Sequence, residues 1–171
     1  MLFRVLNKKL KWMWEEPITW LDDGDIPADP LNNLATSDNT LSVYEVNNDR
    51  WRIERVAAAM VAGRNKSIDD IEFIAFDQSI LDEVGIVLDP TKRGTTCDKE
   101  VNLWHRDMIE ISATKLVAFA KRIVPTVHSD LVLEKRIRQV IIDTGKAGKY
   151  EWSKVQLPNK NELKLEIDKG P

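Results

Sequence analysis

The sequence predicts an α+β or α/β fold: a single domain whose mixed sheet contains one βαβ unit and carries two successive helices packed on it. The first observation is that two short segments rich in β-branched and aromatic residues, 41–46 and 71–76, flank a helical stretch at 49–62. This order is typical of parallel strands joined by a right-handed crossover, either adjacent or separated by one strand. The second observation is that helical patterns follow one another at 103–124 and 129–142, which breaks regular strand–helix alternation.

The chain before the βαβ unit predicts an extended strand and a long acidic loop. Residues 2–14 alternate in the way a strand does, and Trp12 and Trp14 share one of its faces. Residues 22–39 are dense in Asp, Asn, Gly and Pro, which favour turns. We therefore expect a strand that leads into a long loop.

The helix at 49–62 carries recognisable signals at both ends. Asn48 or Asp49 can cap its N-terminus, and Gly63 suits the position after its last turn. Its C-terminal half is apolar on all sides, so that half is expected to be buried all round. Trp51 fits the apolar stripe and is expected to fill the core.

The second half of the chain predicts short elements followed by the two long helices. Because only a few residues join the helices at 103–124 and 129–142, we expect them to turn back on each other, with Phe119 meeting Ile137. The remaining expected elements are a helical turn at 79–84 that ends at Gly85, and strands at 86–88, 150–155 and 163–167.

Length and composition favour one domain, with residues 1–40 as an N-terminal strand and acidic loop, 41–145 as the α/β core and 146–171 as a C-terminal extension. The 171 residues include one cysteine, Cys97, which allows no intrachain disulfide. No apolar run approaches the roughly 18 residues of a membrane span, and the N-terminus lacks the pattern of a signal peptide. We therefore expect a soluble cytoplasmic protein that does not engage membranes.

The charge distribution argues against a dedicated nucleic-acid binder. The net charge is −3, and residues 17–49 carry seven Asp or Glu and no Lys or Arg. Nucleic-acid-binding domains are usually strongly basic. The chain offers a weak basic patch near its C-terminus, formed by Lys135, Arg138, Lys146 and Lys149.

One candidate site lies at the carboxyl ends of the two predicted parallel strands. In open α/β sheets ligands bind at this edge, and polar residues follow both strands there. They are Asn48, Asp49, Asp77 and Ser79. Asp77 could act as a base or a metal ligand in a small hydrolase or nuclease that takes a phosphate-containing substrate. Alternatively, these residues only cap helices and form turns.

His105 is the second weak catalytic candidate. At a helix N-terminus its cationic form would be disfavoured, which suits a neutral imidazole base. A pair with Asp107 is not expected, because residues two apart on a helix do not face each other; Arg106 and Glu110 are the more plausible ion pair. Cys97 and the two histidines have no zinc-like spacing, so we expect no metal and no cofactor.

Tryptophan is the unusual feature of the composition, with six in the chain. Trp12 and Trp14 could form an aromatic docking surface beside the acidic loop, because Trp is enriched at interaction hot spots, or they could equally well fill the core. The first interpretation is therefore a non-enzymatic module that binds another protein, and the alternative is the small hydrolase or nuclease. An enzyme should show a pocket with convergent polar groups, whereas an interaction module should show a patch or groove with exposed aromatic side chains. The sequence determines neither the oligomeric state nor whether the protein is an enzyme.

Overall fold

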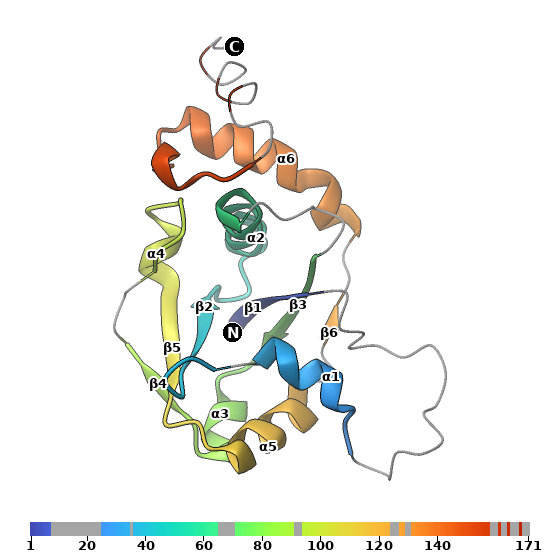
Figure 1. The fold of residues 1–171 in the computed structure, drawn as a ribbon. Coiled ribbons are helices and arrows are strands. Elements are labelled where there is room, and N and C mark those ends of the chain that lie inside the picture. The colour runs from blue at the N-terminus through green and yellow to red at the C-terminus, as the bar shows by residue number, and fades with distance from the viewer. Residues whose placement is uncertain are drawn as a thin grey trace.

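A computed structural model describes one six-stranded sheet with helices on both faces (Figure 1). It covers residues 1–7, 25–34, 36–64, 71–90, 94–123, 127–128 and 131–157, together with 161, 164 and 168. The strand order is β4–β5–β2–β1–β3–β6. The strands are β1 (Leu2–Asn7), β2 (Leu41–Glu45), β3 (Ile71–Phe76), β4 (Val87–Asp89), β5 (His105–Ile109) and β6 (Val127–His128). The predicted α+β class with one sheet is confirmed.

The predicted βαβ unit is present in its separated form. The N-terminal strand β1 lies between β2 and β3 and pairs antiparallel with both, through Leu2 opposite Glu45 and Leu2 opposite Phe76. β2 and β3 therefore run in the same direction without touching. All the pairings between the described strands are antiparallel, so the expectation of a mixed sheet is wrong. The inserted strand is the reason, and it comes from a distant part of the chain.

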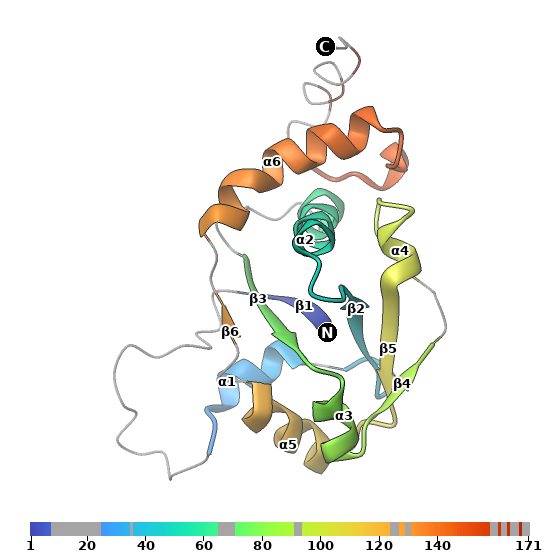
Figure 2. The same ribbon diagram turned by 180° about the vertical axis from the view of Figure 1, so that it is seen from behind.

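Helices cover the sheet in two unequal layers (Figures 1 and 2). On one face α2 (Arg50–Arg64) lies against the strands, and α6 (Leu131–Lys146) packs on the outside of α2. On the other face lie α1 (Ala28–Leu31), α3 (Ser79–Val84) and α5 (Ala113–Ile123). Because α2 is enclosed between the sheet and α6, its run from Val56 to Ala62 is buried on every side, as predicted.

Side chains of alternating strand positions divide the core into two clusters. Phe3, Tyr44 and Phe73 point toward α2 and α6, whereas Leu2, Val43 and Ile74 point toward α3 and α5. This alternation is the period of two expected of a pleated strand that is buried on both faces. The central strands therefore connect two hydrophobic cores rather than one.

The predicted long helix at 103–124 is wrong. Its first turn is a short helix, α4 (Val101–Trp104), which is followed by strand β5, and α5 begins only at Ala113. Glu110 has a left-handed backbone with φ of 57°, and Ser112 Oγ accepts the backbone N–H of Lys115 at 3.3 Å. Strand β5 forms because β2 and β4 pair with it on either side, which supplies its backbone hydrogen bonds.

The two later helices do not turn back on each other. β6 lies between them in sequence, and they pack on opposite faces of the sheet. Phe119 of α5 contacts Phe76 with ring centroids 5.1 Å apart, whereas Ile137 of α6 lies in the other cluster, which contains α2. The predicted helix–helix turn is wrong, because residues 127–128 between the two helices form β6 at the end of the sheet.

Several element ends follow the predicted signals. Asp49 caps α2, since its Oδ1 accepts the backbone N–H of Trp51 at 2.9 Å, and α3 spans the expected residues. Gly85 ends α3 with φ of 67°, a conformation that favours glycine. By contrast, α2 continues through Gly63 to Arg64.

The C-terminal part contributes to the core beside α2. Tyr150 forms an isolated antiparallel bridge with Asp98, and a 3-10 helix, Trp152–Lys154, stands where a strand was expected. Val155 is buried in the cluster that contains α2. The expected strand at 163–167 lies outside the described residues except for residue 164, which is helical, and residues 8–24 of the expected strand and loop lie outside them too. The expected loop at 22–39 is partly helical, with α1 and a 3-10 helix at Asn32–Leu34, so that prediction is wrong in part. Within the described part of the chain, no helix has both the length and the apolar character needed to cross a membrane.

Candidate functional site

The carboxyl ends of β2 and β3 meet at one edge of the sheet, on either side of Met1, as the register of β1 requires. The polar residues that follow them are exposed. Asp49 caps α2, and the backbone oxygen of Asp77 accepts the N–H of Ile80 at 3.1 Å. Asn48, Asp49, Asp77 and Ser79 line neither of the two cavities described below. Asp49 therefore caps α2 through its side chain, and Asp77 contributes its backbone oxygen to the turn that enters α3.

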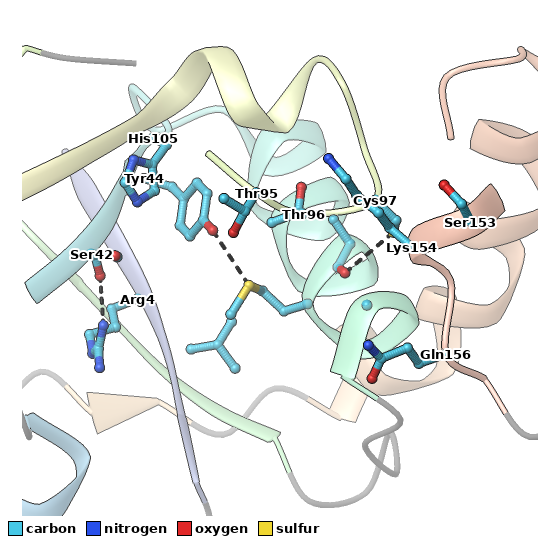
Figure 3. A pocket seen from close by; sticks show the side chains of 14 residues that line it. Arg4, Ser42, Tyr44, Thr95, Thr96, Cys97, His105, Ser153, Lys154 and Gln156 are labelled. Atoms are coloured by element: carbon cyan, nitrogen blue, oxygen red, sulfur yellow. Dashed lines mark hydrogen bonds between the residues drawn. The ribbon is translucent and has the colours of Figure 1, made fainter. Parts of the chain in front are cut away.

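The larger cavity lies at the opposite end of the parallel strands, with a volume of about 410 Å³ (Figure 3). Strands β1, β2 and β5 form one wall, and the C-terminal half of α2 forms the floor. The other wall consists of residues 95–97 and 153–156. Figure 3 shows Arg4, Tyr44 and His105 on the strand side and Lys154 on the opposite side.

A local separation of β1 from β2 opens this cavity. The described pairs of these two strands are Leu2 with Glu45 and Phe3 with Tyr44. Arg4 comes next, and its Nη1 donates a hydrogen bond of 2.6 Å to the backbone oxygen of Ser42. The guanidinium group thus satisfies a strand carbonyl across the gap, and it brings a positive charge to the cavity wall.

Strand β5 places His105 and Asp107 on the same face, opposite Tyr44 and Ser42 of β2. The expectation that the two would not meet is wrong, because it assumed a helix, whereas residues two apart on a strand share a face. His105 Nε2 lies 3.4 Å from Asp107 Oδ1. The neighbouring Arg106 pairs with Glu45 at 2.6 Å rather than with Glu110.

The hydroxyl of Ser42 donates to Asp107 Oδ1 at 3.2 Å. In a serine hydrolase the hydroxyl must instead donate to the imidazole, which accepts its proton during attack. Here both Ser42 and His105 approach the same carboxylate oxygen. The arrangement therefore orients the imidazole and does not activate a nucleophile.

His105 is buried, with 6% of its surface exposed, and its ring packs edge-on against Tyr44 at 5.4 Å. Burial lowers the pKa of the imidazole below its ordinary value; Asp107 opposes this shift and Arg106 adds to it. The imidazole is therefore neutral near pH 7. The expected direction was right, but the cause is burial at the start of a strand and not a helix dipole.

One nitrogen of this imidazole, Nδ1, is buried and has no hydrogen-bond partner within the described residues. Buried polar atoms in native proteins are nearly always paired, so an exception needs an explanation. Cys97 lines the same cavity but is not a candidate nucleophile. Burial raises the pKa of its thiol to about 12, and Sγ lies 3.7 Å from the backbone oxygen of Ala59.

A second polar cluster is centred on Arg55, which is buried in α2. Its Nε and Nη2 donate to the two oxygens of Asp98, each at 2.8 Å, and its Nη1 donates to Glu100 at 2.6 Å. The guanidinium carbon lies 4.8 Å from the centre of the Trp51 ring and 5.6 Å from that of Trp104. The cluster ties α2 to the segment before α4, and it also sets the position of two tryptophans.

Trp51 forms a wall of the second cavity, a groove of about 300 Å³ that we call the Trp51 groove. Arg55, Glu100, Thr144, Ala147 and Lys149 are among its other lining residues. Trp51 is 48% exposed, so its expected role in the core is wrong, whereas its neighbour Trp104 is 8% exposed. The helical spacing of Trp51 correctly predicted its helix but not the side that faces solvent.

The remaining sequence-predicted binding residues are placed only in part. Trp12 and Trp14 lie outside the described residues, as does the side chain of Lys135. In the basic patch, Lys149 donates a hydrogen bond of 3.1 Å to Glu100, so one of the positive charges of the patch is paired within the protein. Among the described residues, no group of three His, Cys, Asp or Glu side chains is placed to hold a metal ion.

Sequence reasoning missed Arg4 and Ser42, because these residues meet the rest of the cavity only through strand pairing. No motif in the chain marks them. The comparisons with known proteins add no further indication: no family model, no curated protein and no solved structure matches the chain.

Proposed function

We propose that the protein is a non-enzymatic binding module that engages another protein through the Trp51 groove. The observation that carries the proposal is the half-exposed Trp51 ring on the wall of a groove. Trp104 contacts it edge-on at 5.8 Å and Arg55 stacks on it, so the ring is held in place before any partner binds. A preorganised tryptophan loses little side-chain entropy on association, and such residues dominate interface energies.

The charges of the groove favour a partner that presents an apolar side chain. Arg55 is paired with Asp98 and Glu100, and Lys149 is paired with Glu100. Asp143, which also lines the groove, accepts a hydrogen bond of 2.8 Å from the side chain of Gln139, so a negative group of the partner would be repelled there. A charged group of the partner would have to compete with these pairs. An apolar side chain placed against Trp51 and Ala147 would remove apolar surface from water without breaking them.

The alternative, a hydrolase or nuclease that acts on a phosphate-containing substrate, has less support. Asp77 and Ser79 line neither described cavity, and Ser42 does not donate to His105. A protein-binding function requires neither a catalytic carboxylate in a cavity nor an activated serine. The proposal places the protein in the cytoplasm, since Cys97 alone offers no intrachain disulfide. It also includes a second contact region, the acidic N-terminal segment that contains Trp12 and Trp14.

The test compares two exposed hydrophobic residues of similar accessibility. Trp51→Ser removes the proposed anchor, and Val87→Ser changes a residue of β4 that is 45% exposed. Each tagged variant and the wild type are used to capture partners from the source cells, and the captured protein is quantified by mass spectrometry. We expect Val87→Ser to retain the partner and Trp51→Ser to lose at least about 90% of it. Equal capture by all three folded proteins would refute the proposal.

A further inference from the structure

One carboxylate of the Trp51 groove has no cationic partner among the described residues. Asp143 lines the groove from α6 and is exposed, and its Oδ1 accepts a hydrogen bond of 2.8 Å from the neutral amide of Gln139. Lys146 also belongs to α6, but it does not line the groove, and no described ion pair joins it to Asp143. Arg52, near the same tryptophans, pairs with Asp49 at 3.9 Å and does not line the groove either. The charge of Asp143 is therefore available to a group that enters the groove.

The charged side chains that build the groove leave a net negative charge. Arg55 and Lys149 line it, and so do Glu100 and Asp143. Behind them, the buried Asp98 pairs with Arg55 at 2.8 Å. Two cations thus face three carboxylates in this set. A cation that enters the groove is attracted by the remaining negative charge, whereas an anion is repelled.

The ring of Trp51 offers a second contact for a cation. Arg55 stacks on the ring at 4.8 Å, yet 48% of Trp51 stays exposed. The π electrons of an indole ring attract a cation placed on it. Ala147 lies one helical turn beyond Asp143, since its N–H donates to the backbone oxygen of Asp143 at 3.0 Å, and it also lines the groove. An apolar surface therefore adjoins the carboxylate and the ring.

An arginine side chain matches these three features together. Its methylene stem supplies the apolar contact that the proposed function requires at Trp51 and Ala147. Its guanidinium is planar, stacks on aromatic rings and donates paired hydrogen bonds to a carboxylate. The ammonium of lysine is compact and strongly hydrated, so it stacks less well. A purely apolar side chain would cover the groove without giving Asp143 a partner.

We propose that the partner places an arginine in the Trp51 groove, with its guanidinium on the Trp51 ring and beside the carboxylate of Asp143. This inference rests on the proposed function and names the side chain that the partner presents. The existing ion pairs of the groove stay intact, because the incoming cation takes a carboxylate that they do not use.

Three blocked tripeptides test the chemistry, with arginine, citrulline or leucine between two alanines. Citrulline keeps the stem and shape of arginine without its charge, and leucine is purely apolar. Binding is followed by the indole N–H resonance of Trp51, which is identified by its absence from the spectrum of Trp51→Ser. We expect the arginine peptide to bind at least about threefold more tightly than the other two, and added salt to reduce this preference.

A matched pair of variants locates the cation site. Asp143→Asn keeps an acceptor oxygen for Gln139 but removes the charge, so it should abolish the preference for arginine over citrulline. Asp82→Asn removes an exposed carboxylate of α3, which lies on the opposite face of the sheet from α2 (Figure 2), and should leave the preference unchanged. In the capture experiment, Asp143→Asn should retain at least about threefold less partner than Asp82→Asn.

The inference is overturned if the citrulline or leucine peptide binds as tightly as the arginine peptide, or if no peptide shifts the Trp51 resonance at millimolar concentration. Survival of the arginine preference in Asp143→Asn would overturn it as well. The proposed function fails on a different result, equal capture of the partner by Trp51→Ser and the wild type. Loss of the partner by Trp51→Ser together with tighter binding of leucine would leave that function standing and remove the arginine.

Discussion

Removal of the Asp98 carboxylate should destabilise the protein by about 4 kcal/mol. Asp98 is fully buried and binds the guanidinium of Arg55 through two hydrogen bonds of 2.8 Å. Breaking a buried ion pair from one side typically costs about 3–5 kcal/mol, because the other charge stays buried without compensation. Glu100 still contacts Arg55 at 2.6 Å, which places the expected loss near the lower end of this range.

A second contribution comes from the start of α4. Asp98 Oδ1 also accepts the backbone N–H groups of Glu100 and Val101, at 2.9 and 3.2 Å. Loss of a capping acceptor of this kind costs about 1 kcal/mol. Asp98→Ala removes both interactions, whereas Asp98→Asn retains an acceptor oxygen for the cap and should therefore be the less damaging change.

Urea unfolding at pH 7, followed by far-ultraviolet circular dichroism, measures these losses. The control is the double variant Arg55→Met/Asp98→Ala, in which no unpaired guanidinium remains. Its loss should be smaller than the sum of the two single losses by at least about 1 kcal/mol, because the residues interact directly. An Asp98→Ala loss below about 1 kcal/mol, or additive losses, would show that the pair does not hold α2 to this segment.

Three further predictions follow from the same contacts. Phe119→Ala should lower the free energy of unfolding in urea by about 3–5 kcal/mol, since Phe119 is fully buried against Phe76. Val117→Ala, on the exposed side of α5, should lower it by less than about 1 kcal/mol, and similar losses for the two variants would contradict the described core. Asp49→Ala should cost about 1 kcal/mol because Asp49 caps α2, and Asp77→Ala should change thermal stability little, so the reverse order would contradict the cap assignment. Burial lowers the pKa of His105 in the folded state, whereas in the unfolded state the imidazole keeps its ordinary pKa of 6.5. The unfolded state therefore binds more protons as pH drops through and below 6.5, and the free energy of unfolding should fall in that range. His105→Gln should reduce the difference in the free energy of unfolding between about pH 7.5 and about pH 5.5. An unchanged slope in that variant would assign the pH dependence to other groups.

Local chemistry predicted many of the elements. The apolar segment at 71–76 is a strand, and the short helix at 79–84 ends at Gly85, the residue whose left-handed backbone closes it. The run from Val56 to Ala62 is buried on all sides, as its lack of polar residues indicated. These features depend on neighbours within a few residues, so periodicity and capping signals contain the information.

In the region from Val101 to Ile123, local patterns did not predict the secondary structure correctly. Apolar residues here fit a helical pattern, and α5 indeed occupies the last part. Residues 105–109 instead form a strand because β2 and β4 supply hydrogen bonds on both sides, an arrangement set by residues more than 15 positions away along the chain. The same misassignment separated His105 from Asp107 in the sequence interpretation.

By itself the sequence determined an α+β or α/β class, the βαβ order and the buried half of α2, because these follow from local periodicity and composition. Only the tertiary structure decided that β1 enters between β2 and β3, and hence that the described pairings are antiparallel. It also decided the candidate sites. Arg4, His105 and Lys154 line one cavity because three distant segments meet there, and Trp51 is half-exposed because it lies on the wall of a groove between the start of α2 and the end of α6. Contacts of this kind arise from long-range pairing and packing, for which a single sequence carries no local signal.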